Sequence, residues 1–282
     1  MRERLLALYH DKKLLAVAKP VPVALHLHEC CDMANTCWSA DALKRRPDSD
    51  SENGKISLPW IGPAYENYRI LVLGENFYEC GGLEAETILI QDAMKQMKQN
   101  KKRVFGGESY SSDGKKYRGT FLYYRMACYS KTLTLFLDQA VASVDLLELG
   151  EASKVVGFLD FVAHTNHIKC SPSGNLSRPE LEMWQQCGKH ILSDEIEILE
   201  PKWIIVMGKV NNAHYLSQFV FPTSVHANGA VGGTVGQIHG RLVNVIVVPH
   251  PSYFRYKIND VASGIIEMAK TLLNAESDQR RA

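Results

Sequence analysis

The chain has 282 residues, of which 45% are hydrophobic and 22% charged, and its formal net charge is +1. This length and composition suit one large globular domain, while the near-neutral charge excludes binding to nucleic acid through a positive field over the whole surface and allows only a local basic face. No apolar stretch approaches the roughly 20 residues of a membrane-spanning helix, so we expect no membrane association.

The N-terminal part of the chain is marked by its cysteines. Three of the seven, Cys30, Cys31 and Cys37, lie close together there. The early apolar run from Leu14 to Ala18 is too short for a secretory signal. We therefore expect a reduced, intracellular, cytoplasmic protein whose cysteines are thiols or ligands. We expect residues 1–65 to form an N-terminal cysteine-bearing segment and linker, 66–276 an α/β domain and 277–282 a tail.

The first predicted strand is the apolar run 69–73, which is followed directly by Gly74, Glu75 and Asn76. Residues 83–99 predict a helix that covers this strand. A polar insertion, about 98–118, then precedes a helix-like run.

A second apolar run, 158–163, predicts a buried strand with Asn166 at its carboxyl end. Pro179 and the acidic residues just after it predict the start of a helix that continues to about Leu199. Residues 203–207 form another apolar run of strand length. Strand, helix and strand therefore follow one another as in a βαβ unit.

The last part of the domain predicts a glycine-rich hairpin or loop over 225–240, a strand over 242–248 and an amphipathic helix over 258–274. The glycines lack the spacing of a dinucleotide-binding loop, so we expect no nucleotide cofactor. The alternation of strands and helices predicts an α/β fold with three layers, α/β/α, around a central, mostly parallel sheet.

Polar residues follow three of the predicted strands: Glu75 and Asn76 the first, Asn166 the second, and His250, which lies between two prolines, the last. In open α/β sheets, ligands bind in the crevice outside the carboxyl ends of the strands. We therefore expect these side chains to form one site.

Five stretches of the sequence carry a resemblance to a known family: GEN at 74–76, TNHIKCSP at 165–172, PELEMWQQC at 179–187, EPKWIIVMG at 200–208 and HPSYFR at 250–255. In order and spacing they resemble the uracil-DNA glycosylase superfamily, and most closely its iron–sulfur branch. The resemblance implies that superfamily's fold and DNA as the partner. It also implies a reaction in which a nucleotide is flipped out of DNA, its uracil is held in a pocket, and water replaces the base at the sugar.

The chemistry of two of these residues agrees with that implication. The amide of Asn166 offers a donor and an acceptor that can pair with O4 and N3–H of uracil, whereas the amino group of cytosine would leave a buried donor unmatched. The stiff backbone around His250 would fix an imidazole donor near O2, where it stabilises the charge on the departing base. A loop cap for Asn166 and a surface turn for His250 are the alternatives.

Glu75 and Asn76 are expected to orient the water and to stabilise the positive charge on the sugar. In the resembled superfamily the position of Asn76 varies, and the branch with alanine there has glutamate at the position of Glu75. This chain has glutamate at position 75 together with asparagine at position 76. Residues 77–82 depart from the usual continuation of the motif. A helix cap is the alternative role.

The resemblance also implies an aromatic side chain that stacks on the base and a wedge that enters the DNA. Phe121 is the best positional match for the first, with core packing as its alternative, and Phe77 is the second candidate. Tyr253 or Phe254 is the expected wedge, with Arg255 on a phosphate. A turn whose aromatics pack on the sheet is the alternative.

The same resemblance implies a [4Fe–4S] cluster, because the iron–sulfur glycosylases carry two ligands near the N-terminus and two in this loop-to-helix segment. The candidate ligands are Cys30 or Cys31, Cys37, Cys170 and Cys187. Zinc could use the same thiolates, and buried thiols without a ligand role are the third reading.

Together these features predict a monomeric DNA glycosylase that removes uracil or another deaminated base without cleaving the backbone, associated with the nucleoid if the protein is bacterial. Two other functions stay open. One is a superfamily member without activity that binds nucleic acid; the other is a hydrolase of nucleosides or small N-glycosides.

Overall fold

The computed structural model describes residues 1–12, 58–76, 85–99, 119–140, 144–169, 181–208, 212–220, 226–228, 230–251 and 256–279. In these ranges one seven-stranded sheet has the order β1-β3-β2-β4-β7-β6-β5. The strands are β1 (Trp60–Ile61), β2 (Ile70–Asn76), β3 (Val162–Ile168), β4 (Trp203–Met207), β5 (His226–Asn228), β6 (Val231–Ile238) and β7 (Arg241–Val248).

The four central strands, β3, β2, β4 and β7, are parallel, whereas β1, β6 and β5 join the edges in antiparallel pairing. All four parallel strands therefore end on the same side of the sheet. In this register Gly74 of β2 pairs with Asn166 of β3, so two motifs far apart in the sequence lie side by side.

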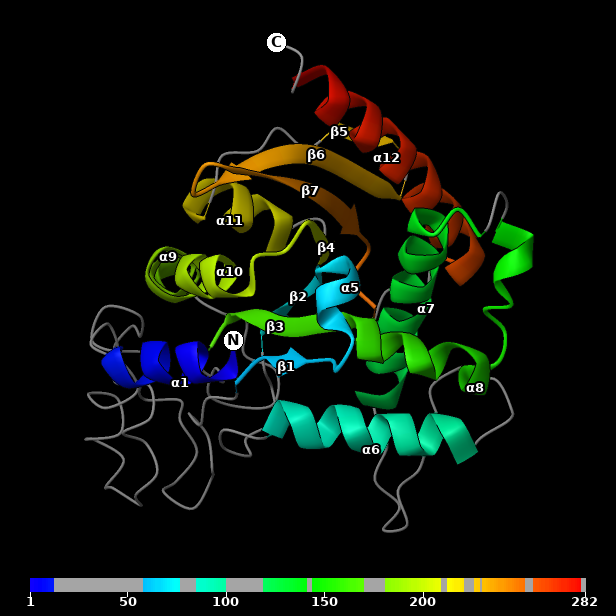
Figure 1. Ribbon diagram of the computed structural model, residues 1–282, viewed down its shortest axis with the longest axis horizontal. Coiled ribbons are helices and arrows are strands. Elements are labelled where there is room, and N and C mark those ends of the chain that lie inside the picture. The colour runs from blue at the N-terminus through cyan, green and yellow to red at the C-terminus, as the bar shows by residue number, and fades with distance from the viewer. Residues whose placement is uncertain are drawn as a thin grey trace.

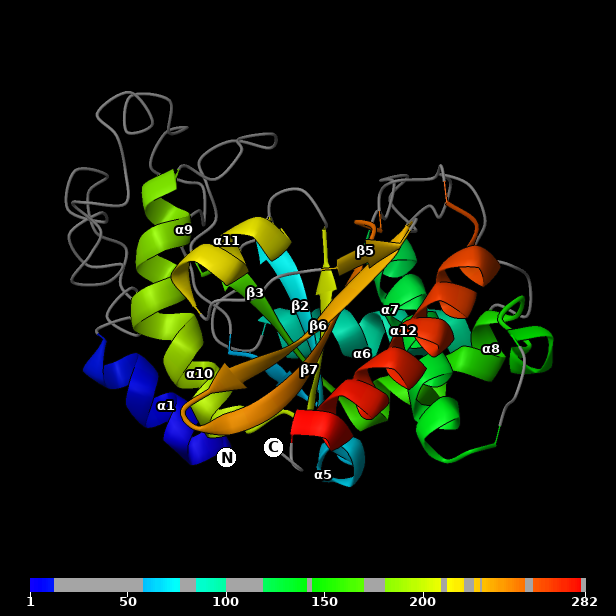
Figure 2. The ribbon, with the colours of Figure 1, turned by 90° about the horizontal axis from the view of Figure 1, so that it is seen from above.

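Helices cover both faces of the sheet (Figures 1 and 2). On one face lie α1 (Arg2–Asp11), α9 (Leu181–Cys187), α10 (Ser193–Leu199) and α11 (Asn212–Phe219). On the other lie α6 (Ala85–Gln99), α7 (Gly119–Leu137), α8 (Ala152–Val155) and α12 (Ile258–Gln279). The short helix α5 (Tyr65–Tyr68) precedes β2. The predicted three-layer α/β/α fold is confirmed.

The central strands read as continuous apolar runs because both of their faces are buried. In β2, Leu71 and Leu73 pack in the core beneath α9 and α10, while Ile70 and Val72 pack in the core beneath α6 and α7. Successive side chains of a strand point to opposite faces, and this alternation divides the hydrophobic residues between the two cores.

The βαβ unit forms as predicted, and its helix contains a short irregularity. Residues Gly188–Leu192 form a π-helical turn between α9 and α10, so Leu181–Leu199 is one helical stretch. The glycine-rich region forms the predicted hairpin: His239 and Gly240, with φ of 48° and 79°, make the tight turn between β6 and β7.

The predicted start of the second strand is wrong. Residues Val156–Phe161 form a 3₁₀ helix, and β3 begins only at Val162. Side chains hydrogen-bond to the backbone of this segment: Trp60 Nε1 donates to the carbonyl of Leu159, and Ser130 Oγ donates to the carbonyl of Phe158. These tertiary hydrogen bonds replace the ladder that a longer strand would need.

The division into 1–65, 66–276 and 277–282 stays a prediction. The sheet already includes β1 ahead of residue 66, and α12 continues to Gln279, past its expected end at 274. A short 3₁₀ helix, Val144–Leu147, lies ahead of α8.

Candidate active site at the carboxyl ends of the strands

Gly74 and Asn166 form the first part of the site. A Cβ built on Gly74 would lie 2.1 Å from Asn166 Oδ1 and 3.2 Å from His164 Nε2. Only glycine therefore leaves room for the Asn166 side chain in this position. Asn166 is half-buried, whereas its neighbours Thr165 and His167 are buried, so its amide is the accessible polar group at the end of β3.

His250 and Glu75 form the second part. His250 follows β7 and is half-buried. Burial lowers the pKa of His250 below its ordinary value, and the nearby charge of Glu75 opposes this by raising it. The two side chains are therefore close enough for their charges to interact. We call Gly74, Glu75, Asn166 and His250 the strand-end site.

Gly208 ends β4 beside His250. Its φ is 116°, in the region that favours glycine, and a Cβ built there would lie 3.9 Å from His250 Cδ2. Its amide donates to the carbonyl of Val248 at 3.0 Å. The end of β4 is thus fixed against the end of β7, close to His250.

Asn212, at the start of α11, holds the strand ends together and was missed in the sequence. It is fully buried, and its Nδ2 lies 3.1 Å from the carbonyl oxygen of Leu73, 3.0 Å from that of Gly74 and 3.2 Å from that of Met207. One amide thereby ties the end of β2 to the end of β4. The only signal in the sequence is an asparagine at a helix start, which is typical of ordinary caps.

His167 extends this network on the same face of the sheet. Its Nδ1 lies 3.3 Å from Asn212 Oδ1, and its Nε2 lies 3.2 Å from the carbonyl oxygen of Trp184. Burial is the main cause that lowers the pKa of His167 to about 3, against opposing hydrogen bonds. The ring is therefore neutral in the folded protein at physiological pH.

A buried ion pair lies below the end of β3. Lys169 pairs with Glu195 of α10, and Thr165 Oγ1 both donates to Glu195 at 3.0 Å and accepts from Lys169 at 2.7 Å. Tyr9 of α1 also donates to Glu195. These bonds connect α1, α10 and β3, so the N-terminal helix is fixed to the strand that carries Asn166.

Cys187 is the one predicted cluster ligand within the described ranges. It is the last residue of α9 and is 2% exposed. The pKa of Tyr9 in α1 is raised mainly by burial, next by Glu195 and least by Cys187. Because Cys187 influences Tyr9, its thiol lies near α1. The other candidate ligands, Cys30, Cys31, Cys37 and Cys170, lie outside the described residues. Among the described residues, no group of three or more His, Cys, Asp or Glu side chains could hold a metal ion.

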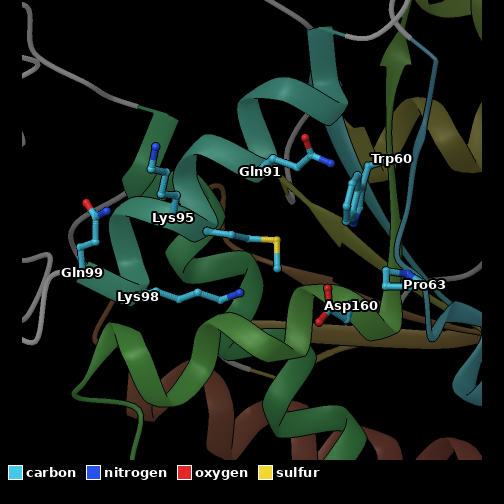
Figure 3. Close-up of a pocket in the computed structure, with 8 residues that line it drawn as sticks. Trp60, Pro63, Gln91, Lys95, Lys98, Gln99 and Asp160 are labelled. Carbon is cyan, nitrogen blue, oxygen red and sulfur yellow. The ribbon is translucent and has the colours of Figure 1, made fainter.

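A cavity in the described part of the chain lies away from the strand-end site. It has a volume of about 570 Å³ and is open to solvent between α6 and β1 (Figure 3). Its lining includes Lys95 and Lys98 near the end of α6 and Asp160, just ahead of β3. It therefore lies toward the amino end of β3, whereas ligands of such sheets bind at the carboxyl ends.

A family model described as the Uracil DNA glycosylase superfamily matches residues 59–263. This match covers more than half of the chain and includes the whole strand-end site. The chain belongs to the uracil-DNA glycosylase superfamily. No curated protein matches the chain.

Several predicted glycosylase residues are described only in part or not at all. Asn76 is the last residue of β2 and Phe121 lies in the first turn of α7, where their backbones are described. Phe77, Tyr253, Phe254 and Arg255 lie outside the described ranges. Arg125 of α7 donates to the carbonyl of Tyr256 at 3.1 Å, so α7 is fixed to the residue that follows the predicted wedge.

The arrangement suits the chemistry of a glycosylase. An accessible amide at the end of β3 can pair with the edge of a base, while a carboxylate lies at the end of β2 and a half-buried imidazole follows β7. None of the described helices combines the length and apolar character needed to cross a membrane.

The close approach at Gly74 gives a first prediction. Gly74→Ala should displace the Asn166 amide, because the new methyl group would lie 2.1 Å from Oδ1. We expect the rate of base excision to fall at least about tenfold, with about 1–3 kcal/mol lost in the free energy of unfolding.

Excision assays measure the rate, and urea denaturation measures the free energy of unfolding. Gly157→Ala, where an added Cβ meets nothing within 4 Å, is the control. Equal activity of Gly74→Ala and wild type would contradict the geometry.

The buried His167 predicts a pH dependence of stability. Its folded pKa, about 3, lies below its ordinary value of 6.5, so the unfolded chain binds a proton first as the pH falls. Stability should therefore decline from pH 6.5 toward pH 3, by up to about 1.4 kcal/mol per pH unit from this group. In urea denaturation at pH 7 to 4, His167→Gln should show a shallower decline, and the exposed His190→Gln should match wild type. Identical slopes in wild type and His167→Gln would refute this prediction.

Proposed function

We propose that the protein is a monomeric DNA glycosylase that hydrolyses the N-glycosidic bond of uracil, or of another deaminated base, and leaves the DNA backbone intact. The observation that carries the proposal is the strand-end site itself: an accessible asparagine beside Gly74, and a half-buried histidine within the field of Glu75. Membership of the superfamily supports a glycosidic bond as the target.

Asn166 reads the base in this proposal. Its Nδ2 donates to O4 of uracil and its Oδ1 accepts from N3–H. Cytosine presents an amino group in place of O4, so two donors would face one another and a buried polar group would be left unpaired, at a cost of about 1–3 kcal/mol.

His250 stabilises the departing base. Burial lowers its pKa, so the ring is neutral at pH 7 and can donate one N–H toward O2 of the base. As the glycosidic bond breaks, negative charge develops on that oxygen. A donor already fixed at this place stabilises the transition state more than the bound substrate.

Glu75 and Asn76 act on the sugar and the water. A carboxylate at the end of β2 can orient a water molecule and stabilise the positive charge that accumulates on the sugar. The closeness of Glu75 to His250 suits this division, because the two groups then flank the bond that breaks. Phe121 or Phe77 would stack on the base. Tyr253 or Phe254 would fill the space that it leaves in the DNA, with Arg255 on a phosphate.

A [4Fe–4S] cluster held by Cys30 or Cys31, Cys37, Cys170 and Cys187 belongs to the same proposal. Cys187 fits a ligand role, because it is buried near α1, the helix that leads into the N-terminal cysteines. A thiolate in so buried a place needs a cation or a metal to stabilise its charge. The cluster would cross-link the N-terminal segment to α9, and through α9 to the base-reading strand.

Iron content tests the cluster. Protein prepared without oxygen should be brown, with broad visible absorbance and close to four iron atoms per chain, and Cys187→Ala should lose most of the iron. Cys128→Ala is the matched control, since burial raises the pKa of the Cys128 thiol to about 12 and its Sγ lies 4.0 Å from the carbonyl of Leu149, on the other face of the sheet. Colourless wild-type protein without iron would rule the cluster out, and bound zinc would favour the zinc alternative.

A panel of substrates tests the activity. Labelled single- and double-stranded DNA, each with one uracil, hypoxanthine or xanthine, is incubated with the protein and then heated in alkali, which breaks strands at sites without a base. We expect breaks at the uracil or at another of these bases, and none in unmodified DNA. Tight binding with no break on any substrate would favour the DNA-binding alternative, and release of bases from free nucleosides alone would favour the nucleoside hydrolase.

A further inference from the structure

Beside Asn166 the structure holds a buried carboxylate–histidine pair that the proposed function does not use. His164 of β3 is 1% exposed and Glu86, in the first turn of α6, is 2% exposed. His164 Nδ1 lies 2.6 Å from Glu86 Oε1, and the hydroxyl of Tyr123 donates to the same oxygen at 3.1 Å. Both contacts cross between elements that are far apart in the sequence.

The partners of this pair select the tautomer of a neutral imidazole. A carboxylate oxygen only accepts, so Nδ1 carries the proton, as in other histidines oriented by a carboxylate. In the neutral ring Nε2 then keeps its lone pair. This atom is buried, and no group in the described part of the chain hydrogen-bonds to it. A buried acceptor without a partner is costly, so the geometry calls for a donor at this place.

The unpaired nitrogen lies next to the residue that is proposed to read the base. His164 and Asn166 are two residues apart on β3, so they share one face of the sheet. A Cβ built on Gly74 would lie 2.1 Å from Asn166 Oδ1 and 3.2 Å from His164 Nε2, so both atoms are close to the same point. Glu86, His164 and Asn166 also line one small cavity of about 10 Å³. A cavity of this volume can hold about one water molecule.

We propose that one water in this cavity donates to His164 Nε2 and to Asn166 Oδ1, and that the Glu86–His164 pair thereby fixes the direction of the Asn166 amide. Both acceptors belong to residues that line the cavity, and a water has two hydrogens to give them. Oδ1 keeps a second lone pair for a ring N–H of the base. Nδ2 then points to the ligand, where it donates to a carbonyl oxygen.

The consequence is a preference for one chemical class of base. Deamination replaces an exocyclic amino group by a carbonyl and adds a hydrogen to the neighbouring ring nitrogen. An amide whose Nδ2 is held outward accepts that pattern and rejects the parent base, whereas an amide free to rotate would read both. His164 is thus a positioning residue for selectivity. This inference rests on the proposed glycosylase function.

A double-mutant cycle tests the coupling. Single-turnover excision is measured for wild type, His164→Phe, Asn166→Ala and the double variant, each on the DNA that wild type cleaves best. We expect His164→Phe to lose about tenfold or more, and to add no further loss once Asn166 is already alanine. His164→Gln, whose amide oxygen can accept from the water, should recover part of the rate. Ser130→Ala, which removes a partly buried hydrogen bond to the carbonyl of Phe158 on the same face of the sheet, should match wild type. Independent losses in the double variant, or no loss in His164→Phe, would overturn the proposal.

A second measurement needs no activity and separates the two proposals. Long-range ¹H–¹⁵N spectra of the imidazoles, with His164 assigned by its Phe variant, should show the Nδ1–H tautomer and an Nε2 shifted as a hydrogen-bond acceptor. In Glu86→Gln the tautomer should become mixed. If wild type excises no base but this spectrum is found, the proposed function fails and the water site stands. A spectrum with the proton on Nε2 overturns the site even in an active enzyme.

Discussion

His250→Ala is expected to lower the single-turnover rate of uracil excision about a hundredfold or more. The variant removes the donor that meets the charge on the departing base, and that charge is greatest in the transition state. Substrate binding should change far less, so the loss should lie in the rate constant and not in the DNA concentration at half-saturation. Quenched-flow or manual time courses with excess enzyme measure both quantities.

The control for this variant is His190→Ala, which removes an exposed histidine outside the strand-end site and should keep the wild-type rate. Burial lowers the pKa of His250, so the ring takes up a proton only below its ordinary value of 6.5. The ratio of wild-type to variant rates should therefore stay constant from about pH 6.5 to 8. A variant that retains the full rate would show that His250 does not contact the departing base.

Asn166→Asp is expected to change which base is excised. The substitution keeps the size of the side chain but replaces the Nδ2 donor by an oxygen that only accepts. O4 of uracil would then face a second acceptor, and we expect excision of uracil to fall at least about a hundredfold. An amino group suits the new oxygen, so any residual activity should shift toward cytosine. Parallel assays on DNA with uracil or cytosine at one position measure the ratio.

Asn67→Asp is the matched control for this change, because Asn67 is exposed in α5, before the first parallel strand. It should leave both the rate and the ratio unchanged. If Asn166→Asp excised uracil as fast as wild type, the edge of the base would be read by another residue.

Much of the fold could be predicted from the chain. The strand 203–207 and the helical stretch to Leu199 formed at the predicted places, because a buried apolar run and a proline with acidic neighbours are local signals. The grouping of Glu75, Asn166 and His250 followed from one rule, that parallel strands end on the same side of the sheet. Their roles in the reaction stay predictions.

The residues that support this site could not be predicted in the same way. Asn212 joins the ends of β2 and β4, and His164 meets Glu86 across 78 positions of the chain. Their importance lies in contacts between distant elements, and no local pattern marks them. The false start of β3 has a similar cause, since the run 158–163 has the composition of a strand but its carbonyls are taken by Trp60 and Ser130.

Direct detection of the released base tests the central claim, that the strand-end site excises a deaminated base. Wild type, His250→Ala and Asn166→Ala are each incubated with uracil-containing DNA, and free base and intact strands are measured by mass spectrometry before any alkali treatment. We predict one free uracil per abasic strand with an unbroken backbone for wild type, and at least about a hundredfold slower release for both variants. Equal release by wild type and both variants, or strand breaks without free base, would contradict the account.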